Sequence, residues 1–208
     1  MASHEGGGVG TAEPGLKPAT ELALHFFCIR ILTVCTANMC RSPMAEAILS
    51  GMLAQSGSAG EVVSAGLLEG GSPMAPEAIK AVADDGPAMD GHTSRRLSPE
   101  DVMTADLVLG MTREHVREVV VLVPEAWPYT FTLKELVRLG EAHGRRGPGQ
   151  PLPSWLAEVG VGRERSALMG AGLIDDIEDP LGGTPARFVE TAAELRDLCR
   201  RLMDLVVA

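Results

Sequence analysis

The sequence predicts a single α/β domain with a four-stranded parallel sheet and helices on both faces. Two observations support this prediction. Short runs of β-branched and other apolar residues alternate along the chain with segments whose apolar residues recur at helical spacing, which is typical of a parallel sheet covered by helices. The length of 208 residues suits one domain with segments to spare, at roughly 150 residues per domain.

The first predicted unit is a strand, a loop and a helix. Residues 29–34 form a continuous, largely β-branched run, which predicts a buried strand. Small polar residues follow, and apolar side chains then recur at four-residue spacing over 44–53, which predicts a helix. Pro43 fits the first helical turn because its missing N–H would have no partner there anyway, and Ser42 is predicted to be the N-cap.

Three more strands are predicted, each followed by a helix. They are 62–66 before a helix over 76–83, 106–111 before a helix from Thr112, and 129–132 before a helix over 133–139. The valines of 119–123 fit a strand as well as a helix, so that assignment stays open. The last element, 185–206, carries four leucines on one stripe and predicts an amphipathic helix packed on the sheet, with Cys199 packed beside the stripe.

Two segments lie outside this pattern. Residues 1–27 are Gly-rich and mixed in charge, unlike a signal peptide, and we interpret them as a flexible N-terminal leader. Residues 140–172 are rich in Gly, Pro and Arg, and they predict a long surface insertion. The remaining chain, 28–208 around that insertion, is the one predicted domain.

Composition and charge exclude several classes of partner. The net charge of −10 repels polyanions, and two Trp, one Tyr and four Phe leave little for base stacking, which excludes nucleic acid. The longest apolar stretch, 22–34, is interrupted by polar residues and shorter than the roughly 20 residues that span a bilayer, so no membrane partner is expected. Four unevenly placed cysteines without a Cys-x-x-Cys pair predict neither a disulfide scaffold nor a zinc site, and they favour the cytoplasm. The oligomeric state stays open.

The loop after the first strand carries the predicted chemistry. Over 35–42 it reads Cys-Thr-Ala-Asn-Met-Cys-Arg-Ser, between a strand and a helix. Backbone N–H groups of such a loop converge on one point, and the helix N-terminus attracts negative charge there, while Arg41 can donate to two phosphate oxygens. The sequence therefore predicts a phosphate-binding loop. Its positive field would stabilise a Cys35 thiolate and activate it as a nucleophile, with Ser42 donating a hydrogen bond to the sulfur.

A phosphate ester also needs a proton on its leaving oxygen, so we expect a carboxylic acid at the same mouth. Asp179 is the best candidate, because Pro180 fixes the direction of the backbone after it and two glycines then allow the chain to bend. Taken alone, an acidic residue in such a segment is more often part of a solvated turn. The assignment therefore depends on the resemblance described next.

Residues 35–46 resemble the signature loop of the low-molecular-weight protein tyrosine phosphatase family, which includes a branch of bacterial protein-arginine phosphatases. The resemblance continues in order through 64–66, 92–97, 105–112 and 179–180. It implies a phosphorylated protein substrate. No cofactor is expected and no metal is required, because the loop amides and Arg41 supply the positive field that a metal would otherwise provide. The resemblance also implies that Cys35 forms a phosphocysteine, that Arg41 binds the phosphoryl oxygens, and that Asp179 is first the general acid and then the general base.

The resemblance implies roles for other positions too. Asn38 and Ser42 would hold the loop, and His92 would support it, although a surface-turn histidine is an equal alternative. Cys40 occupies the place of a second cysteine that forms a reversible disulfide with the nucleophile in some members, or else it is a buried thiol. The other members of the phosphate-binding loop are Thr36, Ala37 and Met39, with alanine where a glycine is usual.

The substrate is less well defined by the resemblance. Family members that act on phosphotyrosine wall the pocket with aromatic residues, where this chain has Leu67, Leu68 and Leu181, which forfeits about 1 kcal/mol of stacking. Phosphotyrosine is still predicted first, as the commoner activity of the family. The alternative is phosphoarginine, because members of that branch share Thr36 after the nucleophile, the Phe-Thr-Leu-Lys-Glu segment 131–135 and a Pro-x-Gly-Gly over 180–183.

Two rival functions use the same loop. A thioredoxin-coupled arsenate reductase needs two further cysteines in a mobile segment, and this chain has none between Cys40 and Cys199. A phosphate-binding module without turnover would result if the Asp179 loop did not reach the phosphate-binding loop. Both are ranked below the phosphatase.

Overall fold

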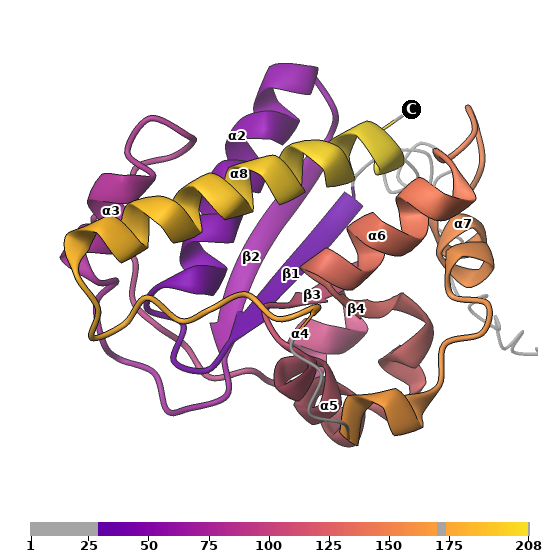
Figure 1. The fold of residues 1–208 in the computed structure, drawn as a ribbon, viewed down its shortest axis with the longest axis horizontal. Coiled ribbons are helices and arrows are strands. Elements are labelled where there is room, and N and C mark those ends of the chain that lie inside the picture. Colours follow the sequence, from indigo (N-terminus) through magenta and orange to yellow (C-terminus); the bar gives the residue numbers. More distant parts are fainter. Residues whose placement is uncertain (1–28, 170–173, 208) are drawn as a thin grey trace, which may run out of the picture.

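A parallel sheet organises the computed structural model, which describes residues 29–169 and 174–207. Its strands lie in the order β2-β1-β3-β4, with every neighbouring pair parallel. Their bounds are β1 Ile29–Cys35, β2 Gly60–Gly66, β3 Leu107–Gly110 and β4 Thr130–Thr132. The predicted four-stranded parallel sheet is thus confirmed (Figure 1). The predicted leader, 1–27, lies outside the described residues.

Helices cover both faces of this sheet, as predicted. Alternate side chains of β1 point to opposite faces, so Ile31 joins one apolar cluster and Leu32 another. The larger cluster is formed with α2 (Arg41–Ser56), α3 (Pro76–Ala81), α6 (Leu133–His143), α7 (Leu152–Val159) and α8 (Pro185–Val206). The smaller cluster is formed with α4 (Pro99–Met103) and α5 (Arg113–Leu122), and two 3₁₀ turns, η1 (Pro124–Tyr129) and η2 (Arg165–Met169), complete the described chain.

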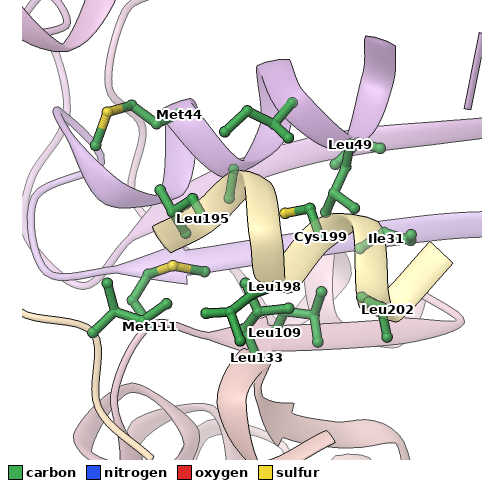
Figure 2. Packing of buried hydrophobic residues seen from close by; sticks show 14 of the residues in the cluster. Ile31, Met44, Leu49, Leu109, Met111, Leu133, Leu195, Leu198, Cys199 and Leu202 are labelled. Carbon is green, nitrogen blue, oxygen red and sulfur yellow. The ribbon is translucent and has the colours of Figure 1, made fainter. Parts of the chain in front are cut away.

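The long helix α8 closes the larger core. Figure 1 shows it crossing the face of the sheet beside α2 and α6. Its leucine stripe is buried, and Figure 2 shows Leu198 beside Leu109 of β3 and Leu133 of α6. Cys199 is fully buried in the same stripe, which confirms its predicted packing role.

The start of α2 differs from the prediction in one respect. The helix begins at Arg41 with Cys40 in the N-cap position, and no side chain caps it, so the prediction of Ser42 as N-cap is wrong. The helix begins two residues earlier than predicted, directly after Cys40. Ser42 lies inside the first turn, fully buried, and its hydroxyl is used by the loop instead.

The valine-rich segment 119–123 is helical up to Leu122. The helix α5 starts from a capping box in which Thr112 Oγ1 accepts from the backbone N–H of His115. Val116 and Val119, three positions apart, are fully buried, while Val121 is 71% exposed. In a strand Val119 and Val121 would share a face, so this burial pattern is that of a helix. The helix therefore holds against the β propensity of valine because one face packs on the sheet.

The prediction of a surface insertion over 140–172 is wrong for its apolar centre. Trp155 of α7 is fully buried in the larger core, and its indole Nε1 donates to Gly144 O at 3.0 Å. A side chain added at Gly140 would lie 2.9 Å from Leu205 and 3.2 Å from Trp155, so α6 and α7 meet closely at this glycine. Burial of the apolar side chains around Trp155 offsets the conformational entropy lost when this part of the segment is ordered. Across the described residues, no helix is long and apolar enough to cross a membrane.

Candidate active site

The loop between β1 and α2 lies at the carboxyl end of the sheet, where parallel α/β folds bind their ligands. Cys35, the last residue of β1, is 3% exposed. Its Sγ accepts hydrogen bonds from the backbone N–H of Asn38 at 3.2 Å and from the hydroxyl of Ser42 at 3.1 Å. Two donors directed at one sulfur stabilise negative charge on it.

Asn38 fixes the shape of this loop. It is the only asparagine of the sequence, it is fully buried, and it holds φ 54°, a left-handed conformation that asparagine tolerates better than most residues. Its Nδ2 donates to Ser42 Oγ at 2.9 Å and to Ser64 Oγ at 2.7 Å, and its Oδ1 accepts from the backbone N–H of Arg95 at 3.0 Å. Ser64 donates in turn to the Glu46 carboxylate at 2.5 Å. Asn38 therefore links the loop to the first turn of α2, to β2 and to the segment at Arg95.

Two residues from other segments also contact the loop. His92 Nε2 lies 2.9 Å from the backbone oxygen of Asn38, so this histidine contacts the loop and is not merely a turn residue. Gly66, at the end of β2, lies against the loop so closely that a Cβ atom there would be 2.9 Å from the carbonyl carbon of Ala37. Met39 joins the neighbouring segment through its backbone oxygen, which accepts from Ala75 N at 2.9 Å.

Arg41 and Asp179 form an ion pair although 138 positions separate them in the sequence. The Arg41 side chain is 5% exposed, and its Nη2 contacts Asp179 Oδ2 at 2.5 Å while Nη1 donates to Ile177 O at 3.1 Å. Arg41 Nε is buried, and it has no hydrogen-bond partner among the residues that the structure describes. Asp179 is 42% exposed at its side chain, and Oδ1 accepts from Leu181 N at 3.1 Å. The guanidinium is thus held in place with donors still available for an anion.

His115 belongs to the same site and was missed from the sequence. It is 1% exposed, and its Nε2 lies 3.0 Å from Thr36 Oγ1, the residue after Cys35. Thr36 Oγ1 is also 3.4 Å from Arg41 Nη2. Burial, with a smaller contribution from the Arg41 charge, lowers the pKa of His115 to about 3. One signal was available, because His115 closely follows a predicted strand, and the carboxyl ends of parallel strands share the edge of the sheet where the loop lies.

Cys40 is a second buried thiol beside the loop. It is 4% exposed, and burial, followed by the charges of Asp179 and Cys35, raises its pKa to about 12. Cys35, Cys40 and Cys199 are all free cysteines in the structure. A reversible Cys35–Cys40 disulfide remains a prediction, which the absence of that bond in peroxide-treated protein, measured by mass spectrometry, would rule out.

The predicted pocket walls lie at the rim of the loop. The backbone N–H groups of Leu67 and Leu68 donate to Thr36 O at 2.8 Å and 3.0 Å, which fixes these residues beside the loop. Leu68 is 55% exposed and Leu181 is 51% exposed, so both present apolar surface to solvent.

Within 29–169 and 174–207, no group of three or more His, Cys, Asp or Glu side chains is placed to hold a metal ion.

Comparison with known proteins agrees with this geometry. A family model described as low molecular weight phosphotyrosine protein phosphatase matches residues 30–143. A protein-arginine-phosphatase of Bacillus subtilis (strain 168) is 31% identical over 173 residues, covering 83% of this chain and 93% of that protein.

Solved structures extend the similarity to the fold. A low molecular weight protein tyrosine phosphatase from T. tengcongensis has a TM-score of 0.63 and 33% identity, covering 84% of this chain and 97% of that chain. The YwlE arginine phosphatase from Geobacillus stearothermophilus has a TM-score of 0.60 and 32% identity, covering 84% of this chain and 90% of that chain. These similarities reach far beyond the loop.

Proposed function

Because the chain belongs to the low molecular weight phosphotyrosine protein phosphatase family and is a cysteine-dependent protein phosphatase, we propose residue roles for its reaction. Cys35 is the nucleophile, Arg41 binds the phosphoryl oxygens, and Asp179 transfers the proton. The observation that carries this proposal is that Cys35 Sγ accepts from Asn38 N and Ser42 Oγ in the loop that ends at Arg41, which is paired with Asp179.

The reaction has two steps. First, the Cys35 thiolate attacks phosphorus, the bond from phosphorus to the leaving atom breaks, and protonated Asp179 gives its proton to that atom. The product is a phosphocysteine. Next, a water molecule attacks phosphorus while the Asp179 carboxylate takes its proton, and the sulfur–phosphorus bond breaks to regenerate the thiolate and release phosphate.

The charges around the loop favour both steps. Arg41 has a buried Nε without a partner among the described residues, and its Nη2 is bound by the Asp179 carboxylate. A bound phosphoryl group can replace that carboxylate on Nη2 and occupy Nε as well, since a guanidinium donates two parallel hydrogen bonds to such an anion. Asp179 is then released at the place where a leaving group departs. Loop N–H groups and Arg41 together stabilise the charge of the transition state.

Turnover of p-nitrophenyl phosphate tests these roles. We expect Cys35→Ser to abolish turnover, and we expect Asp179→Asn to lower kcat on a phosphotyrosyl peptide by about 10²-fold or more. Glu178→Gln is the matched control, because Glu178 is the exposed neighbour of Asp179 and pairs only with surface Arg187 among the described residues. Equal and substantial rates for wild type and Cys35→Ser would refute Cys35 as the nucleophile. Near-zero rates in both would favour a binding module without turnover.

We propose phosphotyrosine in proteins as the substrate, with phosphoarginine as the second candidate. The second is favoured by the exposed aliphatic side chains of Leu68 and Leu181, which offer no aromatic wall for a phenyl ring. The protein-arginine-phosphatase of Bacillus subtilis also matches 83% of the chain. The ratio of kcat/KM on phosphotyrosyl and phosphoarginyl peptides decides between them. A ratio unchanged in Thr36→Ile would exclude Thr36 as a determinant of this preference.

We also propose a reducing, cytoplasmic setting. The mechanism needs Cys35 as a free thiol, and disulfides are rare in that compartment. The described cysteines are free and buried, in agreement with such a setting. Fractionation of cells that express the protein tests this proposal, and activity found only in an extracellular fraction would contradict it.

A further inference from the structure

We propose that His115 is a positioning residue that turns the Thr36 hydroxyl into a fixed hydrogen-bond donor for a phosphoryl oxygen of the substrate. This inference rests on the proposed function, because it adds a residue to the same phosphate site. It starts from a buried histidine whose two ring nitrogens both have defined neighbours.

The hydrogen bonds of His115 determine which ring nitrogen carries the proton. His115 Nδ1 accepts a hydrogen bond from the backbone N–H of Thr112 at 3.0 Å, and a backbone N–H can only donate. Nδ1 therefore carries no proton, and the proton of the neutral ring resides on Nε2. The low pKa of the ring keeps it neutral at physiological pH. The nearby positive charge of Arg41 also disfavours a second proton on the ring.

The Thr36 hydroxyl oxygen has two donors close to it. Nε2–H of His115 donates to Thr36 Oγ1 at 3.0 Å, and Arg41 Nη2 approaches the same oxygen at 3.4 Å. A hydroxyl oxygen has two lone pairs and one hydrogen, so these two donors use its accepting capacity. What Thr36 can still offer is its O–H. The side chain is thereby kept from bonding to its own backbone, which is the usual alternative for a threonine in a loop.

The Thr36 O–H lies where a phosphoryl oxygen of the substrate would bind. Arg41 Nη2 contacts both Thr36 Oγ1 and Asp179 Oδ2, so the hydroxyl lies at the nitrogen where a phosphoryl oxygen replaces the carboxylate. A donor at this point suits an oxygen and not a guanidinium nitrogen, because every guanidinium N–H is itself a donor. The hydroxyl therefore contributes to phosphoryl binding whether the phosphorylated side chain is tyrosine or arginine.

Four single variants and the double variant His115→Leu/Thr36→Val test the proposal. His115→Leu removes the donor, and Thr36→Val removes the hydroxyl while keeping the shape of the side chain. His115→Gln keeps a donor and an acceptor that can replace Nε2 and Nδ1. His143→Leu is the control, because His143 lies away from the site and pairs with Glu158 on the surface. The measurements are kcat/KM on both peptides, the inhibition constant of inorganic phosphate, and the urea midpoint of each variant.

We expect His115→Leu and Thr36→Val each to lower kcat/KM about fivefold to tenfold on both peptides, the loss typical of one hydrogen bond. Phosphate inhibition should weaken in the same proportion. The double variant should be no worse than Thr36→Val, because both changes remove one coupled interaction. His115→Gln should recover most of the loss, and His143→Leu should behave as wild type.

Two results would overturn the proposal. One is multiplied losses in the double variant, which would show that His115 acts independently of Thr36. The other is a lower urea midpoint of His115→Leu with kcat/KM and phosphate inhibition unchanged, which would give His115 a role in stability alone. Failure of the proposed function itself is distinguishable, since it would show as activity retained in Cys35→Ser.

Discussion

Replacement of Asn38 by alanine tests the construction of the loop. Three hydrogen bonds of the Asn38 side chain are lost, to Ser42, Ser64 and Arg95, and each contributes about 1 kcal/mol. Alanine must also hold φ 54°, which costs about 1 kcal/mol more than it costs asparagine. We therefore expect the free energy of unfolding to fall by about 4 kcal/mol, a large part of the roughly 5–15 kcal/mol of a typical domain.

Urea denaturation and p-nitrophenyl phosphate turnover, measured on the same preparations, give the test. We expect kcat to fall together with stability, because the Asn38 N–H and the Ser42 hydroxyl that bind Cys35 Sγ lose their fixed positions. Asn38→Gly should recover about 1 kcal/mol but no activity, since glycine adopts positive φ freely. Ser56→Ala, which removes a hydroxyl that bonds Leu53 O at the far end of α2, is the control. A loss below 1 kcal/mol in Asn38→Ala with normal kcat would refute the account of the loop.

Three further predictions concern single groups around the loop. Gly66→Ala should abolish most turnover, because its Cβ would be 2.9 Å from the backbone of Ala37; normal kcat in a folded variant would contradict this. Between about pH 6.5 and pH 3, the unfolded chain takes up a proton on His115 that the folded chain refuses, so stability should fall as pH falls, by about 1.4 kcal/mol per pH unit. His115→Gln should lose less stability than wild type over that range in urea titrations, and identical slopes would remove His115 as the cause. Iodoacetamide at neutral pH should label Cys35 but not Cys40, because the Cys40 pKa is raised to about 12; peptide mapping with equal labelling of both would contradict that pKa.

The sequence predicts the parts of this site that are local. The strand, the loop and the helix of 29–53 follow from apolar spacing and from Pro43, and Cys35 and Arg41 are placed by that unit alone. The position of Asp179 beside Arg41 needed the family resemblance, because nothing local indicates a contact across 138 positions.

Other parts depend on packing that no local pattern encodes. Ser42 has the residue type of an N-cap, but the loop uses its hydroxyl for Cys35 Sγ, and the helix starts before it. His115 has the position of a capping residue, and its contact with Thr36 exists only because β3 lies beside β1 in the sheet. Trp155 lies in a Gly- and Pro-rich segment, and its burial depends on the absence of a side chain at Gly140 of α6.

The central claim is that the phosphoryl group passes through Cys35. Rapid mixing of the protein with p-nitrophenyl phosphate, followed by quenching and mass spectrometry of the digested chain, measures this directly. We expect a burst of p-nitrophenol equal to the enzyme concentration and one phosphoryl group on the peptide that contains Cys35, with neither in Cys35→Ser. A phosphoryl group on another residue, or steady turnover by Cys35→Ser, would contradict the account.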